Sequence, residues 1–559
     1  MYRLFFRPVT PNTKKKKSYR KLIQKPYSAF EGKIIRHIYI ETLDPFGYSI
    51  IDSIVITKKT LNKVGNKTHV KTKQNTIRNL LLIRENQVFD SLLVKESERL
   101  VRTRDYIRDV SFFVKTVSKS PGFVDIYIRE LDKWSINPKG GISPSRMSIS
   151  LTEENFLGFG HEFENVFTRI NSERSNSFYI NYTIPNFRSS YVSTMFHYGI
   201  DGHKNFNRSI SVERLFYSPF ARWAGGVTIS SLFNNVSLKD IHSVDIPFDL
   251  RFSTQDYWAG IAQKISKGNT ETERATNLIF ALRYLTVRYF GKPYSLDDPL
   301  HIYADEKFYL GSAGLSTRKY VMDKYIFNFG ITEVIPVGKA FGLTVGYQEK
   351  NNTGRLYLGA RVSFGNYYSW GYISSNMEYG TFIHASHTGQ GVFTASVNYF
   401  TGLLEIRRWK FREFVKSQFT IGIKREPYES LNLNEGYGLN GFTSSGLTGT
   451  SRLLFTLQTQ TYAPWNFIGF RFGPYLVFSL GMLGDAIKGF NNSKLYTQIG
   501  LGILIKNENL VISTFQISIA YYPSMPGAGQ NVFKFNPYKT TDFGFRDFET
   551  GKPVPVLFQ

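Results

Sequence analysis

Cysteine is absent from the 559 residues, which excludes a disulfide scaffold and a thiolate metal site. Long apolar runs are missing too: no stretch of about 18 apolar residues occurs, so a helical membrane protein is excluded. Acidic residues are fewer than basic ones, 44 against 69, and the formal net charge is +25. Aromatic residues are abundant, with 48 Phe and 35 Tyr. This composition excludes a disordered chain and fits a large β protein.

The N-terminal 31 residues carry no readable signal peptide. Pro8, Pro11 and the lysine run at 14–17 leave no room for an apolar core of about 7–15 residues. We therefore predict a basic, flexible segment over residues 1–31, and the sequence leaves the route of export open.

Residues 32–135 are predicted to form a small α+β domain. Apolar residues at helical spacing indicate helices over 72–84 and 93–103, and alternating residues indicate a strand over 33–42. Two further strands, 106–117 and 123–131, follow on either side of a Pro-Gly turn. In the first strand, alternation assigns Ile35, His37 and Tyr39 to one face and Ile34, Ile38 and Ile40 to the other.

From about residue 146 to the end, the helical period disappears and strands follow one another. In 355–364, for example, alternate residues from Leu356 to Phe364 are all apolar, whereas the other face is mostly polar or small. Counting such runs directly gives about 20 strands. The strands are long enough to cross a bilayer, and closure removes the exposed edges. We predict a transmembrane antiparallel barrel over 146–559, with a soluble propeller or sandwich as the alternative. Aromatic residues expected in interfacial girdles are Tyr320, Tyr325, Tyr367, Tyr368, Trp370, Tyr521 and Tyr522.

Four motifs carry a resemblance to a known family. Asn155-Phe156-Leu157-Gly158-Phe159-Gly160 is similar to an Asn-Leu-x-Gly-x-Gly turn, and Leu439-Asn440-Gly441-Phe442 to a Val-Arg-Gly-Phe/Tyr loop tip. Val477 to Gly481 is similar to a Phe-x-Asp-x-Gly strand, and Gly500-Leu501-Gly502 to the Gly-x-Gly after it. In this order they resemble the BamA/TamA family of outer-membrane proteins (the bacterial surface antigen family), with one POTRA-like domain at 32–135.

The resemblance implies about 16 barrel strands, within the range of bacterial outer-membrane barrels. It also implies a loop, here at 425–450, that folds into the lumen. In the family an Arg of the loop tip pairs with the strand Asp, and here Asn440 and Ser479 replace both partners. We expect a neutral hydrogen bond between these two side chains to hold the loop, with Gly481 beside Ser479 on the strand.

Signatures of bond chemistry are poor. Neither a Gly-x-Ser-x-Gly elbow nor a Walker loop occurs, so we predict no enzyme and no cofactor. His161-Glu162 does not continue into a zinc-protease motif, and His384 with His387 lacks a third ligand nearby, so no metal is predicted. Arg408, Lys410 and Arg412 alternate on one strand region, which we interpret as a loop in water, with a lumenal or lipid-phosphate-binding stripe as the alternative.

The resemblance implies a protein of the outer membrane of a Gram-negative bacterium, with the N-terminal domain in the periplasm. The barrel would assist insertion or translocation of unfolded outer-membrane or secreted client proteins at a lateral seam. Partners would be these clients, the lipid bilayer and accessory periplasmic or lipoprotein subunits, but no nucleic acid. The first strand, at about 146–153, would meet the last, at about 541–548. The alternatives are a two-partner-type secretion pore and a passive porin or structural barrel. The seam residues would be Asn155, Gly158, Gly160, Phe543 and Phe545.

Overall fold

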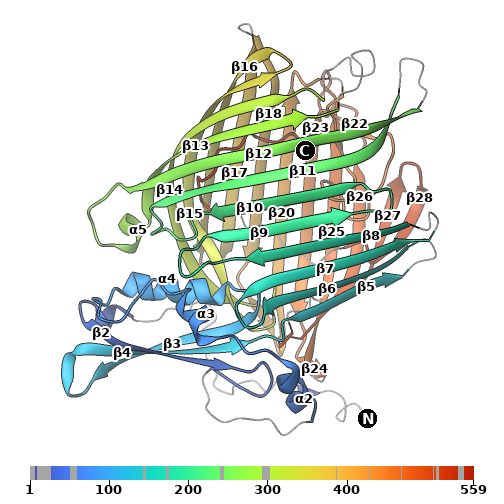
Figure 1. Ribbon diagram of the computed structural model, residues 1–559. Helices are drawn as coiled ribbons and strands as arrows, with labels where there is room; N and C mark the ends of the chain where they lie inside the picture. Colours follow the sequence, from blue (N-terminus) through green and yellow to red (C-terminus); the bar gives the residue numbers. More distant parts are fainter. Residues whose placement is uncertain are drawn as a thin grey trace.

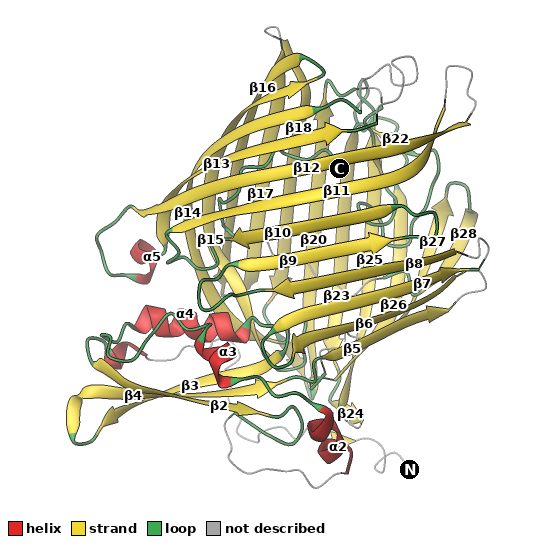
Figure 2. Ribbon diagram, in the orientation of Figure 1, coloured by secondary structure: helices red, strands yellow, loops and turns green. Residues whose placement is uncertain are grey.

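A small α+β domain lies at one end of a large antiparallel β-barrel in the computed structural model of the chain (Figures 1 and 2). No helix in the described part of the chain is long and apolar enough to cross a membrane. The structure describes residues 7–8, 27–50, 60–142, 146–171, 175–239, 245–291, 303–384, 387–426, 428–467, 469–507, 509–510, 515–538 and 547–559. The prediction of a flexible segment over 1–31 falls largely outside these ranges.

The N-terminal domain is a three-stranded sheet covered by helices. The sheet order is β2-β4-β3, with β2 parallel and β3 antiparallel to the central β4. The helix expected over 72–84 is the short α3 (Gln74–Arg78), and α2 (Thr60–Thr68) was not predicted. The elements are η1 (Tyr27–Phe30), β2 (Ile34–Leu43), α2 (Thr60–Thr68), α3 (Gln74–Arg78), α4 (Ser91–Arg102), β3 (Ile107–Val117) and β4 (Ser120–Asp132).

The two faces assigned to β2 were wrong in part. Ile35, Ile38 and Ile40 all face the core, where they are nearly inaccessible. The register with β4 shifts between Ile35 and His37, so a β-bulge places one extra residue there. One extra residue reverses the alternation, which is why strict period-2 counting fails at this point.

The barrel continues from the domain without an intervening helix. Its sheet contains 23 strands, of which β1 (Arg7–Pro8), β19 (Leu404–Ile406) and β24 (Trp465–Phe467) are pieces of two or three residues. The 16 implied by the resemblance is too few for the described residues. The runs counted in the sequence agree in number with the longer strands but not one for one: 136–142 and 529–535 were not counted, the run at 323–334 spans a turn, and the run at 541–548 lies mostly outside the described residues. The longer strands number 20 among the described residues. They are β5 (Ile136–Ile142), β6 (Arg146–Phe156), β7 (His161–Ile170), β8 (Ser175–Ile184), β9 (Ser193–Ile200), β10 (Phe206–Arg214), β11 (Trp223–Lys239), β12 (Asp245–Lys264), β13 (Thr276–Tyr289), β14 (Glu306–Lys324), β15 (Thr332–Lys350), β16 (Thr353–Tyr368), β17 (Gly371–His384), β18 (His387–Thr401), β20 (Trp409–Ile423), β23 (Ser451–Tyr462), β25 (Phe470–Gly484), β26 (Tyr496–Asn507), β27 (Phe515–Met525) and β28 (Gly529–Phe535).

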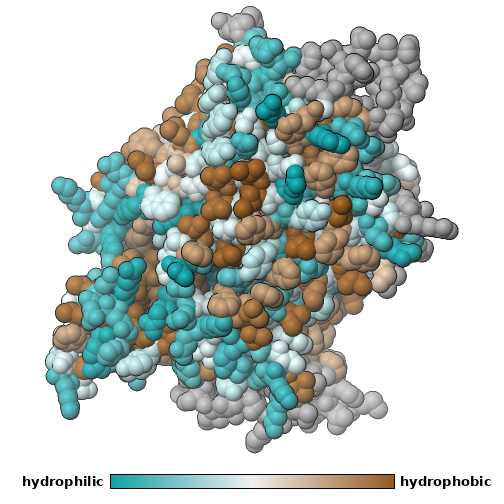
Figure 3. All heavy atoms as spheres, in the orientation of Figure 1, coloured by the Kyte–Doolittle hydropathy of each residue, from teal (hydrophilic) through white to brown (hydrophobic). Residues whose placement is uncertain are grey.

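The outer surface of the barrel is apolar and its interior is polar. On β16, Leu358, Val362 and Phe364 are 39–46% exposed, whereas Tyr357 and Ser363, which alternate with them along the strand, are buried. The adjacent β15 repeats the pattern, with Leu343 65% exposed. Apolar residues accordingly cover much of the barrel wall in Figure 3. This inverted arrangement is the one that a barrel in a lipid bilayer requires, and it confirms the predicted fold class of an α+β domain followed by a transmembrane barrel.

The expected aromatic girdle is only partly present. Tyr368 and Trp370 stack with their ring centroids 5.1 Å apart and are well exposed. Tyr320 and Tyr522 point inward instead, and Tyr522 is fully buried. An inward tyrosine can use its hydroxyl group in the polar lumen, so its position near a strand end does not by itself place it at an interface.

Candidate functional site in the barrel lumen and at the seam

The seam lies between different strands from those predicted. Among the described residues, the first barrel strand is β5 and the last is β28, each of seven residues, and β28 stands next to β5 in the sheet order. Elsewhere along the barrel wall, neighbouring long strands are joined by a residue-by-residue register; the described residues give none for β28 and β5. The prediction of 146–153 as the first strand was wrong, because β5 precedes β6. The predicted last strand, 541–548, lies mostly outside the described residues. Phe543 and Phe545 lie outside the described residues.

The turn at 155–160 fastens the N-terminal domain to the barrel. Asn155 is fully buried; its Nδ2 donates to Thr72 Oγ1 (2.8 Å) and its Oδ1 accepts from the amide of Gly160 (2.7 Å). Thr72 in turn donates to Asp132 of β4. Gly158 contributes its carbonyl oxygen, which accepts from the amide of Lys73 (3.0 Å).

The two glycines of this turn are required by close approach. A Cβ on Gly158 would lie 2.5 Å from the carbonyl oxygen of Lys71, and one on Gly160 would lie 2.6 Å from the hydroxyl of Tyr106. Both have positive φ, +76° and +69°. These contacts place both glycines at the junction between the N-terminal domain and the barrel rather than at the predicted seam.

The loop between β20 and β23 lies in the lumen against the inner wall. It contains the short pair β21 (Leu431–Asn432) and β22 (Thr448–Gly449), and its apolar residues Leu439 and Phe442 are 2% and 0% exposed. They belong to a core cluster shared with β23 to β27, in which Phe442 contacts the rings of Tyr496 and Tyr522. Apolar burial therefore accounts for most of the attachment of the loop.

The hydrogen bonds at the loop tip differ from those expected. The carbonyl oxygen of Asn440 accepts from Gln498 Nε2 (2.7 Å) and Tyr522 Oη (2.5 Å), and that of Gly441 from Lys534 Nζ (2.6 Å). Ser479 faces Thr456 instead (3.1 Å between hydroxyl oxygens). The expected bond between the Asn440 and Ser479 side chains is thus replaced by bonds from β26, β27 and β28 to the loop backbone. Gly481 makes room for Leu433, whose Cδ2 would be 2.9 Å from an added Cβ.

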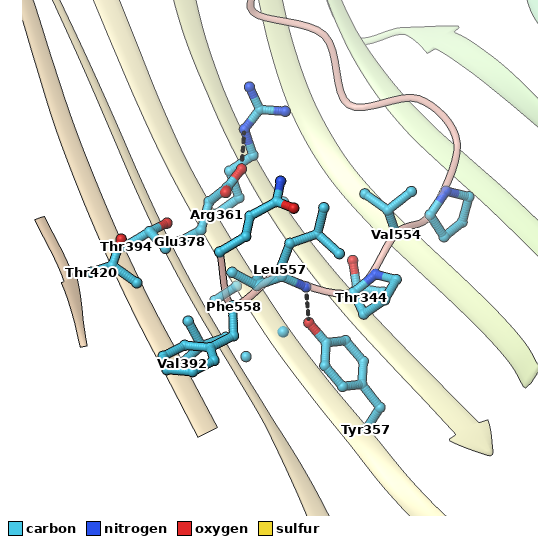
Figure 4. A pocket seen from close by; sticks show the side chains of 18 of the residues that line it. Thr344, Tyr357, Arg361, Glu378, Val392, Thr394, Thr420, Val554, Leu557 and Phe558 are labelled. Atoms are coloured by element: carbon cyan, nitrogen blue, oxygen red, sulfur yellow. Dashed lines mark hydrogen bonds and ion pairs between the residues drawn. The ribbon is translucent and has the colours of Figure 1, made fainter. Parts of the chain in front are cut away.

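A second segment, residues 547–559, also lies in the lumen, and sequence reasoning missed it. Asp547 and Glu549 pair with Arg318 of β14 at 3.1 and 3.0 Å, and Lys552 pairs with Asp256 of β12 at 2.9 Å. Figure 4 shows Val554, Leu557 and Phe558 on this segment in front of the inner wall. Pro553 and Pro555, which lack an amide proton, were the available signal that the segment does not continue the sheet.

The lumen retains space beside the segment. A cavity of about 1020 Å³ is lined by strands β13 to β23 and by residues 550–559. The wall here carries Arg283, Arg361 and Arg425 together with Glu306 and Glu378, so it is charged with both signs.

Arg412 sits in a third polar site, and the preferred interpretation of its region as a loop in water was wrong for this residue. It is 1% exposed and donates to the carbonyl oxygens of Tyr325 (2.8 Å) and Thr401 (2.9 Å) and to Asp323 (3.2 Å). It therefore joins the turn after β14 to the turn after β18. Lys410 pairs with Glu405 nearby.

Metal-ligating side chains are not gathered anywhere in the part of the chain that the structure describes: no group of three or more could hold an ion. His384 Nδ1 lies 2.9 Å from the carbonyl oxygen of Gly354, in a hairpin contact.

No protein-family model matches the chain, and no curated protein matches it significantly. Among solved structures it is similar to BamA from Haemophilus ducreyi lacking POTRA domains 1–3 (12% identity, 90% of this chain and 84% of that one, TM-score 0.33). It is also similar to CdiB from Escherichia coli (10% identity, 92% and 78%, TM-score 0.45) and CdiB from Acinetobacter baumannii (11%, 95% and 94%, TM-score 0.35). TM-scores below 0.5 carry no weight for membership or function, so the proposals below rest on the geometry of this chain.

Proposed function

We propose that the chain is an outer-membrane barrel of the BamA/TamA type that assists insertion or translocation of client proteins through its lateral seam. The proposal includes no bond chemistry and no cofactor. The N-terminal domain would lie in the periplasm and receive unfolded clients, with accessory subunits as further partners. The observation that carries it is the shortness of the two strands at the seam, β5 and β28, which among the described residues are in register only with β6 and β27 respectively.

The seam is suited to opening because few hydrogen bonds can close it. Both strands have seven residues, whereas strands on the far wall such as β14 and β15 have 19. A strand edge that is not paired along its length is a template for another strand. A client strand could therefore add to β5 or β28 and leave the lumen sideways into the bilayer.

The N-terminal sheet offers a first contact for clients at one of its edge strands. Of its two edge strands, β2 is bonded at its start by residues 86–89, whereas β3 pairs only with β4 among the described strands. An extended client could add to the far end of β3 by backbone hydrogen bonds, which do not depend on client sequence.

Two alternative functions require a client or solute to pass along the lumen rather than through the seam. A two-partner-type secretion pore would pass its client along the lumen, so the loop at 425–450 and residues 547–559 would both have to move. A passive porin needs an open lumen, whereas both of these segments occupy it. The two segments narrow the lumen to the cavity beside residues 550–559, which favours a lateral path.

Cross-linking the seam tests the proposal. Because the chain has no cysteine, pairs introduced along β5 and β28 would form the only disulfides. The control is Val362→Cys with Met377→Cys, which face each other across the registered β16–β17 ladder. The protein would be reconstituted in liposomes, and folding of a urea-denatured outer-membrane protein would be followed by its heat-modifiable gel mobility.

We expect the locked seam to abolish assisted folding, reduction to restore it, and the control lock to have no effect. Full activity with a locked seam would refute the lateral path and favour passage along the lumen. Fractionation comes first: a soluble protein without a boiling-dependent gel shift would rule out the membrane barrel altogether.

A further inference from the structure

We propose that the lumenal wall from β12 to β20 is a binding site for an extended peptide with acidic and aromatic side chains. Residues 547–559 occupy this site in cis as a displaceable plug. The inference goes beyond the proposed function, because it concerns what fills the lumen and holds whether or not the seam opens.

The acidic end of the plug is held by one buried cation. The side chain of Arg318 is 5% exposed and reaches both Asp547 and Glu549. Tyr320, two residues further along β14, donates to Asp547 Oδ2 (2.8 Å). Two carboxylates spaced by one residue therefore meet a matched pair of donors on one strand, and this sets the orientation of the segment.

The backbone of the plug is recognised by side chains of the wall. Arg361 donates to the carbonyl oxygen of Glu549 (3.1 Å), and Arg283 donates to that of Pro553 (3.0 Å). Tyr357 Oη accepts from the amide of Val556 (2.8 Å), as Figure 4 shows. These contacts satisfy backbone groups that have no strand partner, so the wall recognises an extended chain as such.

Glycines in the wall make room for the aromatic residues. Phe548 is 2% exposed, and a Cβ on Gly365 of β16 would lie 2.4 Å from its ring. A Cβ on Gly422 of β20 would lie 2.6 Å from the ring of Phe558, which Arg425 also covers at 4.3 Å. Two strands thus lack side chains where the plug places aromatic rings.

The basic residue of the plug meets acidic groups. Lys552 pairs with Asp256 (2.9 Å) and with Glu213 (3.1 Å), while Asp256 also holds Arg283. The order of charges along the segment, acidic and then basic, therefore matches the order of opposite charges along the wall. A matched sequence of charges indicates a specific site rather than chance filling of the lumen.

The test uses two variants and a synthetic peptide of residues 547–559. One variant lacks residues 547–559, and the other carries Asp547→Asn with Glu549→Gln, which changes no barrel residue. Lys307→Ala is the matched control, because Lys307 lies on β14 like Arg318 but pairs with Glu349 at the surface. Conductance in planar bilayers and binding of the fluorescent peptide in detergent are measured, after boiling-dependent gel mobility has shown that each protein is folded.

We expect the full chain to conduct little and to bind no peptide, because its site is filled. The deletion variant should conduct several-fold more, bind the peptide and close again when it is added. A peptide with both carboxylates neutralised should bind about tenfold more weakly, the effect of about 1.4 kcal/mol. Equal conductance of full and shortened chains, or equal binding of a scrambled peptide, would overturn the proposal. If the deletion prevents folding, unchanged conductance of the Asp547→Asn, Glu549→Gln chain would overturn it instead.

Discussion

Asn155→Ala should release the N-terminal domain from the barrel locally. The side chain makes two hydrogen bonds in a site without solvent access, to Thr72 and to the amide of Gly160. Replacing it leaves the buried amide of Gly160 without its acceptor, which costs about 1–3 kcal/mol, and removes a further bond worth about 1 kcal/mol. Thr72 still donates to Asp132, so its hydroxyl is not left unsatisfied. The expected loss is about 2–4 kcal/mol in the free energy of opening this contact.

Amide hydrogen exchange measures that free energy directly, because the amide of Lys73 bonds to Gly158 and is exposed only when the contact opens. A loss of 2–4 kcal/mol corresponds to exchange roughly 30- to 900-fold faster. The effect should be confined to peptides that cover 70–80 and 155–162. Asn491→Ala, in an exposed turn, is the control and should change nothing. If the folded variant exchanges at the wild-type rate in both peptides, the turn does not fasten the domain and our account of the two glycines is wrong.

Two other substitutions test buried charges. Burial raises the pKa of Glu130 well above its ordinary value of 4.5, and Asp132 adds to the shift. Since the folded state keeps this proton while the unfolded state loses it, stability of the N-terminal domain should fall by about 1.4 kcal/mol per pH unit above that value, up to the folded pKa. Glu130→Gln should flatten this slope in denaturant titrations between pH 5 and 8, and an unchanged slope would assign it to other groups. Arg412→Lys keeps the charge but cannot reach all its acceptors, so the barrel should lose about 3 kcal/mol. The measurement is the temperature at which the folded gel band disappears, and a midpoint equal to that of Lys307→Ala would refute the role of the guanidinium group.

Some features followed from the sequence alone because they are local. Alternation along 355–364 places Leu358 and Val362 on one face whatever the rest of the chain does, and the structure exposes that face. The order of elements in the N-terminal domain also followed from its periods, except that α2 was not predicted and α3 is shorter than the helix expected over 72–84.

Tertiary structure decided which segments fill the lumen and where the barrel closes. Residues 547–559 have no periodic pattern, and their position depends on Arg318 and Arg361, which are distant in sequence. The bulge in β2 and the close contacts of Gly158 and Gly160 likewise depend on elements that only folding brings together. The alternation of residues along a strand determines on which face of the sheet a side chain lies. Contacts between residues hundreds of positions apart determine which segment packs against that face, and no local sequence pattern encodes these contacts.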